Sequence, residues 1–234
     1  MAAGKGSRIS SITKSEPKSF LKLGDKTLID HQIEALLNCG IRKIVIVIGY
    51  CSQLFKSKYS NNPNIELVIN PFYENSNVLA SVWFAKQYLF DGFYFMHADT
   101  FFEETILKEI IKNEHNIVLA VKKKLSVEEE MKVQVNKNKI TMINKTMDCN
   151  LAYGEFIGLA KITEQAAQSL IPVVEHKIEY EKAINDYFES VLQEMININV
   201  EVDYIDIGNR MAIEIDFPED YQEAKMLYKK MEKE

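Results

Sequence analysis

The chain has 234 residues, of which 47% are hydrophobic and 26% charged, and its net charge is −6. This length and composition fit a globular protein with one full hydrophobic core and exclude a disordered or fibrous chain. The acidic balance argues against general nucleic-acid binding, and the lack of a long apolar run argues against a membrane span.

A glycine-rich segment, Ala2-Ala3-Gly4-Lys5-Gly6-Ser7-Arg8, stands near the start of the chain. Glycine adopts backbone angles that a Cβ would block, so such a segment can fold tightly and aim several N–H groups at one anion. Pro17 then stiffens the approach to Lys18. Such N–H donors and separately held cations suit a nucleoside triphosphate. A short Gly-x-Gly also suits an ordinary turn, and the segment matches neither the Walker loop nor the six-residue dinucleotide fingerprint.

Helical and strand patterns alternate over the next ninety or so residues. Residues 28–37 have apolar side chains at helical spacing, whereas residues 44–48 form the continuous β-branched run that is typical of a buried parallel strand. Further patterns predict helices over 51–59 and 78–89 and strands over 65–70 and 92–99. Helices that alternate with buried strands predict an α/β protein with a doubly wound sheet, which we expect to form one domain over residues 1–234.

The second half of the chain continues this alternation with one interruption. The patterns predict helices over 105–112, 163–170, 180–195 and 218–232, and strands over 116–122, 155–162, 199–205 and 212–216. The interruption is the polar, lysine-rich stretch 122–150, where a turn at 136–138 predicts a hairpin with an exposed face. We expect this hairpin to act as a flap beside the site.

Three cysteines, Cys39, Cys51 and Cys149, are odd in number and far apart in the sequence. Their spacing suits no metal site, so we interpret them as reduced thiols. The amino terminus has no apolar region of the kind that a secretory signal contains. Together these features predict a cytoplasmic protein.

Asp99 and Asp216 each end an apolar strand pattern. Ligands bind at the carboxyl ends of strands in open α/β sheets, so we expect both carboxylates to lie beside the glycine-rich segment. Two carboxylates on neighbouring strand ends can hold Mg²⁺, although helix capping explains both residues equally well from spacing alone. We interpret His97, two residues before Asp99, as a packed side chain rather than a ligand.

The glycine-rich segment, followed by Pro17-Lys18-Ser19-Phe20-Leu21, resembles the signature of the nucleotidyltransferases that make NDP-sugars and CDP-alcohols. The resemblance covers nearly the whole chain. It implies the mixed, mainly parallel sheet of the nucleotide-diphospho-sugar transferase fold, which is GT-A-like. Family members carry a short hydrophobic strand just before the segment, and this chain has Met1 where that strand would end. We therefore expect the first strand to be missing.

The resemblance also implies roles for individual residues. Lys18 and Arg8 would stabilise charge on the phosphates, and Mg²⁺ would be held by Asp99, Asp216 and Glu214. The implied nucleotide-binding residues are Ala2, Ala3, Gly4, Lys5, Gly6, Ser7, Gly49, Tyr50, Asn75, Ser76, Asn77 and Ser81. Core packing of Tyr50 and helix capping by Ser76 or Asn77 stay open as alternatives.

Two further stretches, Tyr153–Lys161 and Glu179–Glu181, resemble the branch of the family that handles phosphocholine and 2-aminoethylphosphonate. Acidic and aromatic side chains suit an acceptor that carries an ammonium group. The expected acceptor-binding residues are Glu155, Tyr180 and Glu181 for the ammonium group and Arg210 for the acceptor phosphate. An ordinary position on a helix surface explains the acidic residues about as well, and an ordinary position in the core explains the aromatic residue about as well.

The sequence thus predicts a Mg²⁺-dependent cytidylyltransferase. It would transfer CMP from CTP to the phosphate or phosphonate of a small acceptor and release pyrophosphate. A sugar-1-phosphate nucleotidyltransferase that uses another NTP is the first alternative, but the chain lacks the long sugar-binding insertion of those enzymes. A non-catalytic nucleotide-binding sensor is the second alternative. The sequence leaves the oligomeric state open, a homodimer included.

Overall fold

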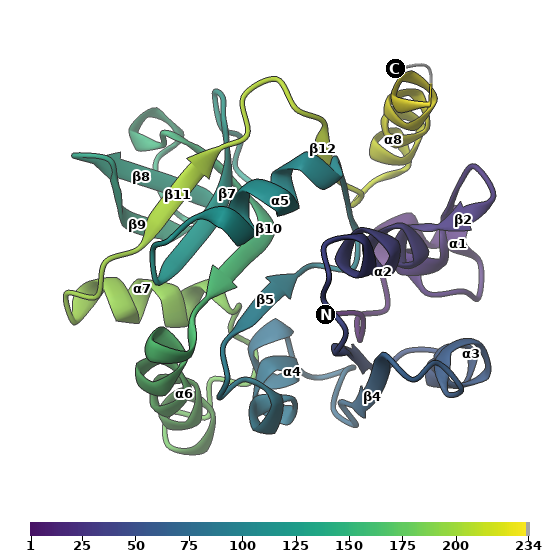
Figure 1. The fold of residues 1–234 in the computed structure, drawn as a ribbon, viewed down its shortest axis with the longest axis horizontal. Coiled ribbons are helices and arrows are strands. Elements are labelled where there is room, and N and C mark those ends of the chain that lie inside the picture. The colour runs from purple at the N-terminus through teal and green to yellow at the C-terminus, as the bar shows by residue number, and fades with distance from the viewer. Residues whose placement is uncertain (233–234) are drawn as a thin grey trace.

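Helices and strands alternate along residues 1–232, the part of the chain that the computed structural model describes (Figure 1). The helices are α1 (Ser10–Thr13), α2 (Leu28–Asn38), α3 (Ser52–Tyr59), α4 (Val78–Phe84), α5 (Glu104–Lys112), α6 (Glu164–Glu179), α7 (Glu189–Asn197) and α8 (Pro218–Met231). The strands are β1 (Lys22–Leu23), β2 (Lys26–Thr27), β3 (Ile44–Ile48), β4 (Ile65–Ile69), β5 (Phe93–Met96), β6 (Thr100–Phe102), β7 (Ile117–Lys123), β8 (Lys132–Asn136), β9 (Lys139–Asn144), β10 (Gly154–Ile162), β11 (Asp203–Asp206) and β12 (Ala212–Glu214). Within this part of the chain, every helix is too short or too polar to span a bilayer.

The long strand β10 organises the sheet. It pairs antiparallel with β7, β8 and β5, while β11 joins β7 in parallel and β8 continues into the predicted hairpin with β9. Strands β3 and β4 form a separate parallel pair. The predicted mixed sheet is confirmed, but its pairs are mostly antiparallel rather than mainly parallel, because β10 runs against all three of its partners.

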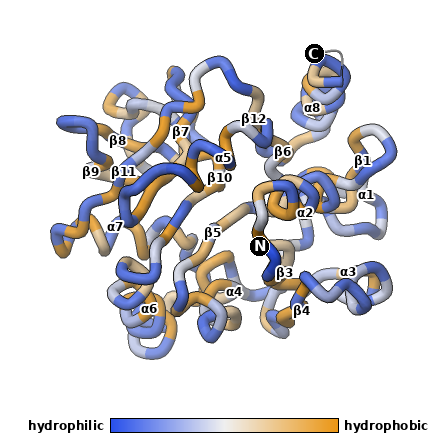
Figure 2. Tube along the Cα trace, in the orientation of Figure 1, coloured by the Kyte–Doolittle hydropathy of each residue, from blue (hydrophilic) through white to orange (hydrophobic). Residues whose placement is uncertain are grey.

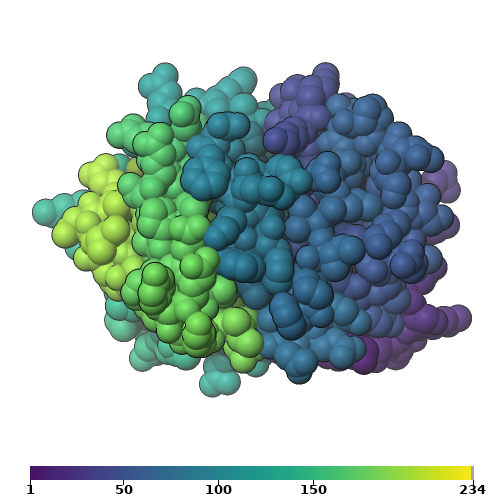
Figure 3. All heavy atoms as spheres, turned by 90° about the horizontal axis from the view of Figure 1, so that it is seen from below, coloured from purple at the N-terminus to yellow at the C-terminus, as the bar shows by residue number. Residues whose placement is uncertain are grey.

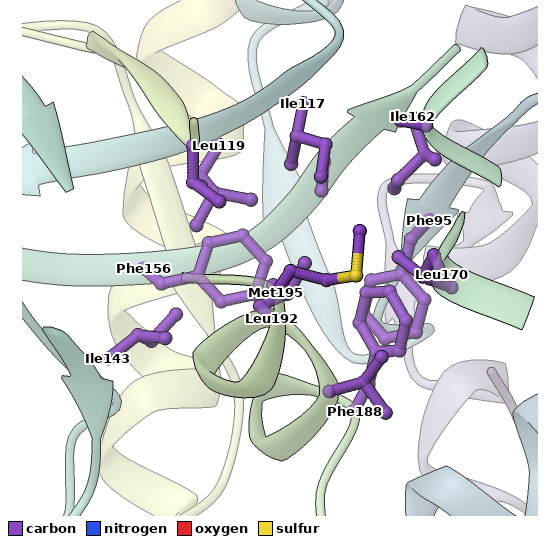
Figure 4. Close-up of a cluster of buried hydrophobic side chains, with 14 of the residues drawn as sticks. Phe95, Ile117, Leu119, Ile143, Phe156, Ile162, Leu170, Phe188, Leu192 and Met195 are labelled. Carbon is purple, nitrogen blue, oxygen red and sulfur yellow. The ribbon is translucent and has the colours of Figure 1, made fainter. Parts of the chain in front are cut away.

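Side chains on β7 alternate between the two faces of the sheet, as the period of two along a strand requires. Leu119 and Val121 face a core shared with α4, α6 and α7. Val118 and Ala120 face a second core shared with α2, α3 and α5. Figure 2 shows hydrophobic residues along much of β7. Figure 4 shows part of the first core, in which Phe156 reaches toward α7. Helices therefore cover both faces, which confirms the doubly wound arrangement.

Two parts of the chain lie on opposite sides of the face that Figure 3 shows, the early residues on one side and residues of the second half on the other, with the segment around β5 between them. Helix α8 is an exception to this division, because it packs with the early residues through Tyr221 and Ala224. Strand β5 forms hydrogen bonds on both sides, with Met1, directly ahead of the glycine-rich segment, and with β10.

The start of α2 is held by a capping box. The Thr27 hydroxyl oxygen accepts a hydrogen bond from the Asp30 N–H, and the Asp30 carboxylate accepts one from the Thr27 N–H. Lys58 and the Tyr59 hydroxyl of α3 donate to the same carboxylate. This network joins the first two long helices on one side of the sheet.

Three predicted elements need correction. Helix α6 continues through Pro172 to Glu179 rather than ending at Leu170, because buried Leu170, Ile171 and Val174 keep it packed against the first core. Residues 180–188 are not helical, and α7 begins at Glu189. Strand β11 begins at Asp203 rather than at 199.

The first three residues lie where the expected first strand would end. The Met1 amino group donates to the Met96 carbonyl at 2.7 Å, and the Ala2 N–H donates to the Val47 carbonyl at 2.9 Å. A single parallel bridge joins Ala2 to Ile48. Met1 and Ala2 therefore lie between the ends of β3 and β5.

Candidate functional site

The Lys18 ammonium lies between two carboxylates that are distant in the sequence. Its Nζ is 2.5 Å from Asp99 Oδ2 and 2.6 Å from Asp216 Oδ1. Burial alone would lower the pKa of Lys18, but the two carboxylates raise it above its ordinary value. Burial likewise opposes ionisation of Asp99, yet Lys18 and His97 hold the pKa of that carboxyl below its usual range. The two acidic strand ends singled out in the sequence therefore lie side by side.

The glycine-rich segment lies against this group. Gly6 has φ +60°, and a Cβ there would lie 3.1 Å from the Cβ of Lys18, so the segment packs directly on the lysine stem. The Ala98 N–H donates to the Met1 carbonyl at 3.1 Å, which ties the start of the segment to the residue before Asp99. Gly4 and Lys5 are exposed. The segment thus presents an open backbone next to the lysine and the acids.

Arg8 and Ser7 follow in the same turn. The Arg8 guanidinium is 3.3 Å from Asp216 Oδ2 and 3.2 Å from Glu129 Oε2, and it stacks over the Phe217 ring. Ser7 is exposed at the start of a short 3-10 turn. Because the Arg8 side chain is half exposed, it has room to turn toward an anion beside the glycine-rich segment.

His97 lies in a buried space between two further carboxylates. Its Nε2 is 3.6 Å from Glu189 Oε1, and its Nδ1 is 3.7 Å from Glu214 Oε1. Burial alone would lower the pKa of His97, but Glu214, Glu189 and Asp99 raise it to about 9. The ring fits because β10 bulges at Gly158, whose φ is +73° and where a Cβ would lie 2.7 Å from His97 Nδ1. His97 is therefore packed, as expected, but as an imidazolium among acids.

Glu189 is the residue that sequence reasoning missed. Its side chain is 1% exposed, and neither carboxylate oxygen has a hydrogen-bond partner among the residues described. Burial raises the pKa of this carboxyl, while His97 opposes the rise. In the sequence Glu189 is distinguished only as an acidic residue before an apolar stretch. An ordinary residue in the first turn of a helix has the same pattern.

These side chains fit a divalent cation. Asp99 and Glu214 each offer a carboxylate oxygen, and these two atoms and a ring nitrogen of His97 lie within 4.8 Å of one another. Asp99 Oδ1 is buried and has no hydrogen-bond partner in the described part of the chain. Carboxylate oxygens are the ligands that Mg²⁺ prefers, so the donor set at Asp99, Glu214 and nearby Asp216 suits that ion.

A second group of predicted residues lies at the carboxyl ends of β3 and β4. The Tyr50 N–H donates to the Ala3 carbonyl at 3.0 Å, and a Cβ at Gly49 would lie 2.5 Å from the Cβ of Tyr73. This close approach packs the loop that carries Asn75 onto Gly49, beside the glycine-rich segment.

The polar residues at the start of α4 have local partners. The Asn77 side chain accepts from the Val78 N–H and caps the helix, which confirms the capping alternative for that residue. The Asn70 amide donates to the Ser76 and Ser81 hydroxyls at 3.1 and 3.0 Å. Ser81 is buried. These contacts fix the loop that borders Gly49.

The predicted acceptor residues separate into two groups. Glu155 lies on β10 and pairs with Lys124 at 2.9 Å; burial raises its pKa, and the nearby Glu214 adds to the rise. Tyr180 and Glu181 lie at the end of α6 instead, where their partners are His176 and Lys177. Arg210 is held by the Glu109 carboxylate and by the carbonyls of Asp206 and Ile207. The structure thus brings Glu155 toward Glu214 but engages the other three elsewhere.

Comparison with known proteins places this geometry in a family. Residues 1–131 match the model of the MobA-like NTP transferase domain. The chain belongs to this family. The match includes the glycine-rich segment, Lys18 and Asp99, whereas Glu189, Glu214 and Asp216 lie beyond it.

Relatives of this NTP transferase include two named cytidylyltransferases. The CTP:phosphoglutamine cytidylyltransferase of Campylobacter jejuni is 26% identical over 95% of this chain and 96% of the relative. The choline-phosphate cytidylyltransferase of Streptococcus pneumoniae is 32% identical, but over 49% of this chain and 47% of the relative. The predicted resemblance to NTP transferases with cytidylyltransferase relatives is confirmed.

Solved structures share the fold along the whole length. The CTP:phosphocholine cytidylyltransferase from Streptococcus pneumoniae matches with a TM-score of 0.83 at 22% identity over 97% of this chain and 96% of that chain. The inositol-1-phosphate CTP transferase from T. maritima matches with a TM-score of 0.79 at 25% identity over 97% and 94%. A UDP-glucose pyrophosphorylase matches with a TM-score of 0.80 at 16% identity over 98% and 97%. The predicted nucleotide-diphospho-sugar transferase fold is confirmed.

Proposed function

We propose that this NTP transferase is a cytidylyltransferase, which transfers CMP from CTP to the phosphate or phosphonate of a small acceptor and releases pyrophosphate. One observation carries the proposal: Lys18 lies between Asp99 and Asp216, directly against the glycine-rich segment. The proposal that CTP is the nucleotide substrate is supported by the relative from Campylobacter jejuni, whose name includes CTP and which aligns over 95% of this chain.

The reaction needs no nucleophile from the protein. An oxygen of the acceptor phosphate attacks the α-phosphorus of CTP and forms a new P–O bond. The bond from that phosphorus to the oxygen that bridges to the β-phosphate breaks, and its electron pair leaves with pyrophosphate. Since the attacking oxygen already carries charge, the protein contributes by positioning and by neutralising charge.

Lys18 and Arg8 supply that neutralisation. Lys18 reaches the triphosphate by exchanging its carboxylate partners for phosphate oxygens, and Arg8 turns toward them from Asp216. The exposed backbone of Gly4 and Lys5 donates N–H groups to the same charge. The loop of Gly49 and Tyr50 borders the other side and is assigned to the nucleoside.

Asp99, Asp216 and Glu214 would hold a divalent cation such as Mg²⁺. When bound, it neutralises the triphosphate and orients the α-phosphate. His97 and Glu189 lie behind these ligands and hold Glu214 in place through charge. The cation fits the donor set described above because every ligand offered by these three residues is an oxygen.

The surroundings favour an acceptor with a positive group. Glu155 and Glu130 share one lysine, Lys124, and among the described residues Glu189 forms its ion pair with His97. This excess of carboxylates beside Glu214 would repel an acceptor that is anionic throughout and attract an ammonium. Phosphocholine and 2-aminoethylphosphonate therefore fit the site better than a sugar 1-phosphate.

Pyrophosphate release tests the proposal. CTP, UTP, GTP and dTTP are each offered with phosphocholine, 2-aminoethylphosphonate, phosphoglutamine and glucose 1-phosphate. We expect release with CTP and a zwitterionic acceptor, and at least a thousandfold loss of that activity, on the order of 4 kcal/mol, in Asp99→Asn without loss of the circular dichroism of the fold. Release with UTP or dTTP and the sugar phosphate would identify the alternative transferase. Nucleotide binding without release for any acceptor would identify a sensor.

A further inference from the structure

Strand β4 is the outer member of the β3–β4 pair. In the described residues β4 pairs only with β3, to which it runs parallel over Ile65–Ile69. Figure 1 shows β4 at the lower border of the molecule, with α3 beside it. The open edge of such a strand presents a row of unpaired N–H and C=O groups, which can pair with a further strand.

The hydrogen bonds to β3 decide which backbone groups of β4 face the open edge. The Asn64 carbonyl accepts from β3 at 2.8 Å, and the Asn70 N–H donates to β3 at 2.9 Å. Because backbone groups alternate in direction along a strand, the even-numbered residues of β4 bond to β3 and the odd-numbered residues point outward. The Ile65 N–H is used within the preceding turn. The N–H groups of Leu67 and Ile69 are therefore directed to the open edge.

The side chains along this edge are mostly apolar. Ile69 is 45% exposed, and Phe72, which follows the strand, is 61% exposed. Leu67 and Val68 are half-buried, and Glu66 is the one charged residue of the strand. Natural proteins protect an open edge with lysines, prolines, bulges or a covering segment, and the five residues of β4 include none of the first three. The strand is therefore suited to pairing.

The sequence of β4 matches a second copy of itself. When two β4 strands pair antiparallel about Leu67, Ile65 lies opposite Ile69 and Glu66 lies opposite Val68. The outward groups of Leu67 then exchange hydrogen bonds across the axis, and the Ile69 N–H reaches the Ile65 carbonyl of the other copy. Apolar side chains meet, and the two Glu66 carboxylates stay apart. An axis shifted by one residue to Glu66 would set these carboxylates against each other, which is unfavourable.

We propose that β4 is a dimerisation edge, at which two copies of this chain pair antiparallel about Leu67 and join their sheets. The interface is isologous, since the same strand serves both copies. A five-residue strand buries less area than a standard interface of about 1,600 Å², so we expect a dissociation constant of about 10 to 100 µM. The antiparallel direction keeps the loops around Gly49 in the two copies apart. This pairing is independent of the nucleotide and of the acceptor.

Sedimentation equilibrium between about 5 and 500 µM tests the proposal. We expect a monomer–dimer equilibrium, and Ile69→Lys should weaken it at least about tenfold, because edge lysines oppose strand pairing. The matched control is Met226→Lys, at a 65% exposed position on α8, which should leave the equilibrium unchanged. Circular dichroism checks the fold of both variants. A protein that stays monomeric to 500 µM, or a dimer that Ile69→Lys does not weaken, would overturn the proposal.

Amide exchange identifies the edge itself. Samples above and below the dissociation constant are compared by NMR. The Leu67 and Ile69 amides should exchange at least about threefold more slowly in the concentrated sample, because pairing occupies their N–H groups. The Glu66 and Val68 amides, which already bond to β3, should keep their rates. Protection that rises with concentration elsewhere in the protein, but not at Leu67 and Ile69, would contradict the proposed edge.

Discussion

Replacing Lys18 with methionine should move metal affinity and turnover in opposite directions. The ammonium is 2.5 Å from Asp99 and 2.6 Å from Asp216, and its side chain is 13% exposed. Methionine keeps much of the length and the apolar stem but removes the charge. In Lys18→Met the two carboxylates lose their counter-charge, and a divalent cation no longer competes with the ammonium for them.

The size of the gain follows from the charges. Two unit charges 4 Å apart interact by about 4 kcal/mol at an effective dielectric constant near 20, and a divalent cation doubles this value. Water screens much of that energy, because the Asp99 and Asp216 side chains are 23% and 33% exposed. We therefore expect about 1.4 to 3 kcal/mol, which is about ten- to a hundredfold tighter binding of the cation to the nucleotide-free protein.

The loss of turnover has a separate cause. A charged side chain directed at charge that develops in the transition state stabilises that state by about 3 to 4 kcal/mol. Removing the ammonium in Lys18→Met should therefore lower kcat about a hundred- to a thousandfold. Electron paramagnetic resonance of Mn²⁺ measures the affinity, and pyrophosphate release measures the turnover. Lys26→Met, which removes an exposed lysine paired with Glu34, is the matched control and should change neither. Weaker or equal Mn²⁺ binding in Lys18→Met would refute the reasoning.

Three further substitutions test the fold. Burial alone would raise the pKa of Asp30, but its hydrogen bonds lower the pKa to about 2. The Asp30 carboxylate therefore stabilises the folded protein fully above about pH 4, and this contribution disappears as the pH falls through 2. Asp30→Asn should lower the free energy of unfolding by about 1 to 2 kcal/mol at neutral pH, allowing for solvent screening, and urea titrations at low pH should show the difference vanish. Gly158→Ala should lower the free energy of unfolding by at least about 2 kcal/mol in the same urea titration, because φ is +73° at this position and the new Cβ would meet His97. An unchanged urea midpoint would contradict this packing. Phe188→Ala should lower the free energy of unfolding by about 3 to 5 kcal/mol, because the buried Phe188 ring stacks on Phe95 with centroids 4.3 Å apart. Calorimetry measures this loss, and a smaller value would contradict the prediction.

Elements with a strong local pattern were predicted closely. The β-branched run of β3 and the apolar spacing of α2 specify their own conformation, and the structure places both within one residue of the expected bounds. Asn136–Asn138 likewise turns the chain between β8 and β9, since Lys137 and Asn138 adopt the positive φ that such a turn requires. In these cases neighbouring residues along the chain supply the deciding interactions.

The stretch between α6 and α7 shows where local patterns fail. Its residues have helical spacing, yet the Ile184 carbonyl accepts from the Asn77 N–H and the Asp186 carbonyl accepts from the Leu79 N–H. The first N–H groups of a helix have no partner within that helix, and α4 finds its partners here. The Ile184 and Asp186 carbonyls therefore accept from another helix, and the stretch does not form the helical ladder that the pattern predicted.

The site combines both situations. Asp99 and Asp216 were recognisable because each ends a strand, and the family signature ranked them above helix caps. Glu189 carried no such signal, since its importance comes from burial against His97, and that burial depends on a bulge at Gly158 on a different strand. Arg210 shows the converse, because its residue type suited an acceptor phosphate while its position commits it to Glu109. Residue type therefore indicates what a side chain can bind, but the partner is decided by which strand ends the sheet brings together.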